Sequence, residues 1–191
     1  MPKKVDHQER RTLIADALMR VAAERGLEAV SLRHVAAEAG VSAGMVQHYF
    51  ATKDEMMTFA MAVVRDRSQV RVTEAIARLC TTPPPRLLTR TLIAALLPLD
   101  EQSRGDARVA LAFLAYAAAR PDAVARDDST DLLSFVAGLL PTPDARTAAR
   151  GLLALMEGLG LYLISGKYSA EQALAVLDAH LDRLFAAGEN A

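Results

Sequence analysis

Apolar residues recur at helical spacing along almost the whole chain, and no segment shows the sustained apolar–polar alternation of a half-buried strand. The first stripe covers residues 13–21 and ends at Gly26, a residue type that commonly terminates helices. Ser31 and Ser42 are each placed to cap a short helix, and Gly40 separates these two helices. The pattern therefore predicts three short helices near the N-terminus.

A longer helix is predicted next, because residues 52–55 read TKDE, a capping box that opens a helix reaching about Leu79. Three consecutive prolines at 83–85 break the chain there. Five further helices are expected beyond the prolines, over about residues 86–97, 106–120, 129–140, 144–165 and 169–187. The predicted fold class is all-α, with a domain over residues 1–54, a second over 55–191, and the long helix joining them.

Composition and charge narrow the class of protein. Hydrophobic residues make up 52% of the 191 residues and charged residues 24%, which is typical of a globular chain. The single cysteine, Cys80, excludes an internal disulfide and indicates a reducing compartment. The charged N-terminus is no signal peptide, and the apolar stretches 109–119 and 151–166 are short for a membrane span. We therefore expect a cytoplasmic protein with no membrane partner.

The segment GVSAGMVQHYFATKDEM, residues 40–56, has an unusual polar face. A helix, a tight turn at Gly40 and a short capped helix form the pattern of a helix-turn-helix, whose second helix enters the DNA major groove. Small residues at Ala43 and Gly44 allow a close approach to the groove wall, and Gln47 and His48 reach base edges or phosphates from there. The segment therefore predicts binding to double-stranded DNA.

Two residues of the same helix have a different expected role. Val46 and Phe50 lie four positions apart, so they are expected to anchor the helix on a small core. The alternative is a plain helical hairpin inside a bundle, but spacing, caps and the polar face all favour the DNA-binding motif.

The stretch IADALMRVAAERGLEAVSLRHVAAEAGVSAGMVQHYFATKDEM resembles the TetR family of transcriptional repressors. The positions that carry the resemblance are Gly26, Ser31, Ala36, Gly40, Val41, Ser42, Tyr49, Phe50 and Lys53. One position departs from the family pattern: a tyrosine that commonly touches a phosphate is replaced by Gln47, which either substitutes for that contact or reads a base. The segments ARVALAFLAYAAARP and MEGLGLYLISG resemble the BetI-type subgroup.

The resemblance implies phosphate contacts by Ser31 and Arg33 at the second helix and by Tyr49 and Lys53 around the third. A basic N-terminal arm with Lys3, Lys4, Arg10 and Arg11 either reaches DNA or is simply solvated. The expected DNA-binding residues are Ser31, Arg33, Ser42, Ala43, Gly44, Gln47, His48, Tyr49 and Lys53.

Leucines at narrow helical spacing mark the last two predicted helices. They form two stripes, Leu152, Leu155, Leu159 and Leu163, and Leu174, Leu177, Leu181 and Leu184. Such stripes are either ordinary core or a four-helix interface with a second copy. A regulator that reads a two-fold operator is itself two-fold, so we expect a homodimer through these two helices.

Aromatic and methionine side chains gather in the middle helices, where the resemblance implies a pocket for a small-molecule effector. The candidates are Phe59, Met61, Phe113, Tyr116, Phe135, Met156 and Glu157. The chain has no tryptophan and nine other aromatic residues, which disfavours an aromatic cage for a quaternary amine, so a largely apolar effector is expected. Glu157 interrupts an apolar run, and a buried acid there needs either a structural partner, such as Arg108 or Arg150, or a ligand.

Enzymatic motifs are absent from the sequence. The four histidines show no metal-ligand spacing, and neither a nucleophile elbow nor a phosphate-binding loop occurs. We therefore expect no enzyme, metal or cofactor. The predicted function is that of a sequence-specific DNA-binding regulator, a repressor released from a palindromic operator by a small molecule; the alternatives are control by a protein partner and a helical-bundle enzyme.

Overall fold

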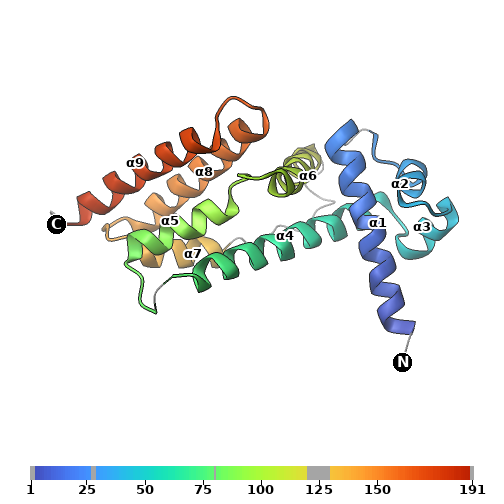
Figure 1. Cartoon of the computed structure of the whole chain (residues 1–191), viewed down its shortest axis with the longest axis horizontal. Helices are drawn as coiled ribbons and strands as arrows, with labels where there is room; N and C mark the ends of the chain where they lie inside the picture. Colours follow the sequence, from blue (N-terminus) through green and yellow to red (C-terminus); the bar gives the residue numbers. More distant parts are fainter. Residues whose placement is uncertain (1–2, 27–28, 80, 120–129, 190–191) are drawn as a thin grey trace. The chain divides into compact units, whose positions relative to one another are not determined.

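The computed structural model describes residues 3–26, 29–79, 81–119 and 130–189. All nine elements assigned in these ranges are α-helices, which confirms the all-α fold class (Figure 1). They are α1 (Lys3–Arg25), α2 (Leu32–Ala39), α3 (Ala43–Tyr49), α4 (Lys53–Ala77), α5 (Pro85–Leu96), α6 (Glu101–Ala119), α7 (Thr130–Leu139), α8 (Ala145–Ile164) and α9 (Ala170–Glu189).

Capping side chains explain the N-terminal ends of α2, α3, α4, α6, α8 and α9. The Ser169–Gln172 capping box before α9 is complete, with the Gln172 amide donating to Ser169 Oγ at 3.1 Å and the Ser169 amide to Gln172 Oε1 at 2.9 Å. The start of α6 was predicted five residues too late. Asp100 accepts from the Ser103 amide at 2.8 Å, and Ser103 Oγ accepts from the Asp100 amide at 3.1 Å, so α6 already begins at Glu101.

The chain forms two compact units that differ from the predicted domains. The first unit contains Met1–Arg67 and Gly105–Ala125, and the second contains Ser68–Arg104 and Arg126–Ala191. The boundary predicted between residues 54 and 55 therefore lies inside the first unit. The helices α4 and α6 both run from one unit into the other, so each unit takes part of each helix.

The first unit has its own hydrophobic core, to which several helices contribute. Its fully buried large side chains include Ile14 and Leu18 from α1, Val46 from α3 and Met56 from α4. The part of α6 that belongs to this unit contributes Val109, which is also fully buried. The core therefore depends on a helix that sequence reasoning placed in the other domain.

Arg67 of α4 joins three helices of the first unit. Its guanidinium donates to Asp16 Oδ1 of α1 at 2.6 Å and to Asp106 Oδ1 of α6 at 3.1 Å. The Asp106 side chain is only 3% exposed, whereas Arg67 and Asp16 are each 33% exposed. A carboxylate buried to this extent is costly unless it is paired, so Arg67 offsets much of that cost.

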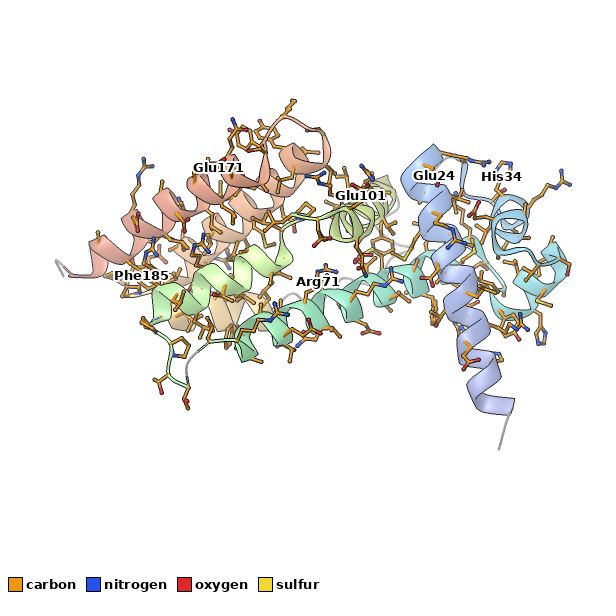
Figure 2. All side chains as sticks on the ribbon, in the orientation of Figure 1. Glu24, His34, Arg71, Glu101, Glu171 and Phe185 are labelled. Carbon is orange, nitrogen blue, oxygen red and sulfur yellow. The ribbon has the colours of Figure 1, made fainter. Side chains whose placement is uncertain are left out.

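The second unit is built from α5, α7, α8 and α9 around buried leucines, with α8 and α9 side by side (Figure 1). Glu171 and Phe185 mark the beginning and the later part of α9 in Figure 2. Arg90 of α5 donates to both carboxylate oxygens of Asp178 on α9, at 2.6 and 3.0 Å. These hydrogen bonds hold the pKa of Asp178 below its usual range.

By length and composition alone, α8 is apolar enough to cross a membrane, a property it shares with core helices of many soluble proteins. In this chain Leu152, Leu159 and Leu163 of α8 are buried in the core of the second unit. Helical packing within the unit therefore accounts for the apolar character of this face of α8.

Replacing Arg67 with alanine should destabilise the chain, because the buried Asp106 carboxylate loses this cation. We expect Arg67→Ala to lower the free energy of unfolding by about 3 kcal/mol. Arg78→Ala is the matched control, since Arg78 and Glu74 form an ion pair between side chains that are 77% and 61% exposed. That variant should lose about 0.5 kcal/mol or less. Urea denaturation of both variants measures the difference, and equal losses would contradict this role of Arg67.

Candidate nucleic-acid interface

The turn between α2 and α3 is built around one glycine. Gly40 adopts φ +66, a left-handed conformation that costs a residue with a Cβ atom more than it costs glycine. The amides of Gly40 and Val41 donate back to the carbonyls of Ala37 and Ala36, at 3.3 and 3.0 Å, which ends α2 and redirects the chain. The predicted helix–turn–helix is thus present in the first unit.

Both serines predicted to cap the two helices do so. Ser31 Oγ accepts from the His34 amide at 3.2 Å, and Ser42 Oγ accepts from the Met45 amide at 3.1 Å. His34, at the start of α2 in Figure 2, is held by its own contact of 2.6 Å between Nδ1 and the Ala29 carbonyl oxygen. A capping hydroxyl still has its proton to donate, so both serines retain a donor for another group.

The two sides of α3 differ sharply. Val46 is fully buried, and so is Phe50, which caps the helix at its C-terminal end. The other side is exposed and carries Ala43, Gly44, Gln47 and His48. A Cβ atom added at Gly44 would find only Ser42 Oγ, at 4.0 Å, so nothing within the chain requires glycine at this position. The open side is therefore shaped for contact with something outside the chain.

The remaining predicted DNA-binding residues border this face. Arg33 is exposed on α2, and Lys53 is half-buried as the first residue of α4. Tyr49 is half-buried at the end of α3, with its ring 5.2 Å from His48 and 4.7 Å from His7 of α1. Sequence reasoning missed His7, because helical periodicity alone does not show which part of α1 reaches α3.

The predicted basic N-terminal arm is helical, and one of its cations interacts within the chain. Residues from Lys3 onward form part of α1. Arg11 lies over the rings of Phe50 and Phe59, at 4.9 and 4.6 Å, and pairs with Glu55 at 3.5 Å. The Arg11 guanidinium therefore interacts within the chain and links α1 to α4. The side chains of Lys3 and Lys4 lie outside the part that the structure describes.

The structure places the candidate effector residues in two groups. Phe59, Met61 and Phe113 pack against the core of the first unit, and the ring of Phe59 lies 5.4 Å from that of Phe50. Met156 packs against the core of the second unit, and Phe135 is 49% exposed on α7. The side chain of Tyr116 lies outside the described part. Packing within each unit accounts for Phe59 and Met156 without a ligand.

Glu157 is exposed, so the expectation of a buried acid is wrong for the single chain. The reason is its place on α8: it lies two residues before the buried Leu159, which is roughly 200° around the helix. An exposed carboxylate needs no buried partner, so neither Arg108, Arg150 nor a ligand is required to explain it.

The leucine stripes of α8 and α9 are core within one chain. Leu152, Leu177 and Leu181 are fully inaccessible, and Leu159 and Leu163 are nearly so. The stripe residues Leu155, Leu174 and Leu184 pack against the same core. The prediction that these leucines themselves meet a second copy is therefore wrong, because they are already used in packing α8 and α9 on the second unit.

Metal chemistry finds no support in the described ranges, where no three histidine, cysteine or acidic side chains are grouped to hold an ion. Cys80 lies outside the described residues.

The comparison with known families agrees with this interface. Residues 14–58 match the family described as bacterial regulatory proteins, tetR family. Residues 85–186 match the family described as BetI-type transcriptional repressor, C-terminal. The two matches together cover both the helix-turn-helix and most of the helices that follow α4.

Curated relatives point the same way. The HTH-type transcriptional regulator PksA of Bacillus subtilis (strain 168) is 34% identical over 177 residues, covering 85% of this chain and 82% of PksA. The HTH-type transcriptional regulator BetI of Stenotrophomonas maltophilia (strain R551-3) is 32% identical over 194 residues, covering 95% of this chain and 96% of BetI. These relatives are regulators, in agreement with the expectation that the chain is not an enzyme.

Solved structures share the fold. A transcriptional regulator from Rhodococcus sp. Rha1 superposes with a TM-score of 0.82 at 35% identity, covering 91% of this chain and 95% of that one. The multidrug binding protein EbrR, solved with imidazole, gives a TM-score of 0.62 at 30% identity, covering 90% and 94%. With a capped helix-turn-helix, an open face on α3 and relatives that span nearly the whole chain, this protein belongs to the TetR family of DNA-binding transcriptional regulators, with a BetI-type C-terminal region.

Proposed function

We propose that this regulator binds a near-palindromic operator as a homodimer and inserts α3 of each copy into the DNA major groove. The observation that carries the proposal is the open face of α3, opposite the buried Val46. Ala43 and Gly44 let the backbone approach the groove wall, while Gln47 and His48 read base edges. The two reading helices then lie about 34 Å apart, one turn of DNA.

The surrounding residues hold the DNA backbone in this arrangement. Ser31 and Arg33 at α2, with Tyr49 and Lys53 around α3, are proposed to contact phosphates. Phosphate contacts position a protein on the duplex but carry no sequence information, so these residues supply affinity rather than specificity. His48 and Gln47 carry the specificity.

The dimer is proposed to form through the exposed sides of α8 and α9 instead of their leucine stripes. On α8 this side carries Gly151, Ala154, Gly158 and Leu161 together with the exposed Arg150 and Glu157, and on α9 it carries Val176. Leu161 is 45% exposed, an unusual amount for a leucine next to small residues. Small residues allow two helices to approach closely, and a second copy would cover this apolar surface by the same face on both partners.

We further propose that a small, largely apolar molecule bound in the second unit releases the repressor from DNA. Phe135 offers an exposed aromatic ring on α7 and Met156 a half-buried thioether on α8. The similar protein EbrR is described as multidrug binding, which fits an adaptable apolar site. Because α4 runs through both units, its displacement would change the separation of the two α3 helices and weaken operator binding.

Gly44→Leu tests the close approach of α3. In the free protein the added side chain has room, so folding and thermal stability should be kept. On DNA the same side chain would fill the space that the groove wall needs, and operator binding should fall by at least about tenfold. Titration with the duplex found by genome-wide footprinting measures this effect. Normal operator affinity in a folded variant would contradict the placement of α3.

Matched and scrambled duplexes separate the two kinds of contact. His48→Ala should lower the ratio of specific to non-specific affinity by about tenfold, the value of one base contact. Lys53→Ala should weaken binding to both duplexes and lower the salt slope by about one unit. Arg78→Ala removes a comparable charge from the second unit and should change neither quantity. If His48→Ala and Lys53→Ala both bind like the parent protein, the assignment fails.

Gly158→Arg tests the dimer surface. A Cβ atom at Gly158 meets nothing within 4 Å, so the variant should fold as a single chain, while a buried charge at the helix contact should split the dimer. Sedimentation velocity distinguishes the two states. Gly138→Arg on α7 is the matched control, because Gly138 is equally open and should leave the dimer intact. A dimeric Gly158→Arg protein would rule out this face.

The effector proposal makes a prediction about ligand class. Neutral aromatic compounds should raise the melting temperature and release operator DNA, and choline should do neither, because a chain with no tryptophan and nine other aromatic residues disfavours an aromatic cage. Phe135→Ala should reduce the response to the aromatic compounds without changing DNA binding. A thermal-shift screen followed by operator release measures both, and a response to choline alone would overturn the apolar assignment.

A further inference from the structure

The N-terminal part of α1 reaches the DNA-binding face, at His7. Its ring lies 4.7 Å from the ring of Tyr49, with the two planes at 58°. The ring of His48 lies 5.2 Å from the same tyrosine ring, in an edge-to-face arrangement. The tyrosine ring therefore contacts two imidazoles, one from α1 and one from α3.

These contacts restrict the tyrosine. A side chain packed against two rings has fewer rotamers available, so less further entropy is lost when its hydroxyl binds a phosphate. His7 is exposed although its ring lies 4.7 Å from that of Tyr49, which leaves part of the imidazole accessible to solvent. An imidazole N–H and a phenol O–H on neighbouring rings are two donors for an anion or for two adjacent phosphates.

We propose that His7 is a further DNA-backbone contact, in which its imidazole N–H donates to the phosphate held by Tyr49 or to its neighbour. The inference rests on the proposed DNA-binding function and adds a residue of α1 to the interface. Since phosphates are the same at every base pair, His7 contributes affinity and no sequence preference.

The competing role is purely structural, with His7 packing α1 against α3. His7→Phe separates the two roles, because phenylalanine keeps an aromatic ring beside Tyr49 and removes the N–H donor. A structural role predicts normal DNA binding in this variant. A phosphate contact predicts an unchanged melting temperature and about tenfold weaker binding, the loss of one charge-assisted hydrogen bond.

The experiment uses the full-length protein with two fluorescent duplexes of equal length, one carrying the footprinted operator and one of scrambled sequence. Anisotropy titrations compare the parent protein, His7→Phe and Tyr49→Phe. We expect His7→Phe to lose affinity for both duplexes equally, and Tyr49→Phe to show a similar uniform loss.

Three results would overturn the inference. Equal affinity of His7→Phe and the parent protein for both duplexes would leave His7 with a packing role only. A loss confined to the operator duplex would make His7 a base-reading residue instead. If the parent protein binds neither duplex, the proposed DNA-binding function itself fails. The first two results concern His7 alone and leave that function standing.

Discussion

A helix of seven residues is not stable alone in water, so α3 depends on the core beneath it. Val46 and Phe50 are the two side chains that fix it there, and both are fully buried. Arg11 and Phe59 close over Phe50 from α1 and α4. Because this anchoring uses one side of the helix only, the other side, with Ala43, Gly44, Gln47 and His48, is left exposed. The DNA-binding face exists because so few residues are needed to hold α3 in place.

The same core shows why the first unit is larger than a helix-turn-helix. Val109 of α6 is buried in it, and Asp106 of α6 is paired with Arg67 of α4 beside Asp16 of α1. A buried carboxylate fixes the positions of the groups that neutralise it more strictly than an apolar contact does. Two helices that continue into the second unit are therefore part of the structure that supports α3. In the proposed mechanism this continuity gives a ligand in the second unit a route to the reading helix.

The two sides of α8 illustrate how an interface differs from a core. Its leucines Leu152, Leu159 and Leu163 are buried in the interior of the second unit. Its exposed side combines small residues with Leu161, Tyr162, Arg150 and Glu157. The ring of Tyr162 contacts Tyr168 at 5.1 Å, and Lys167 lies over it at the same distance. A surface of this composition costs little in the monomer but gains from being covered. The proposed dimer therefore forms through the side of α8 that does not pack in the core of the second unit.

The sequence by itself determined what depends on neighbours along the chain. Helical spacing, the capping serines, the Gly40 turn and the proline breaks are local, so the helices, the motif and its polar face were all predictable from residue order. The tertiary structure decided everything that depends on residues far apart. It turned Arg11 inward onto Phe50, placed His7 beside Tyr49, buried the leucine stripes and left Glu157 in solvent. A helical period shows that a face is apolar, but only packing decides which partner covers it, because the same stripe suits a core and an interface equally well.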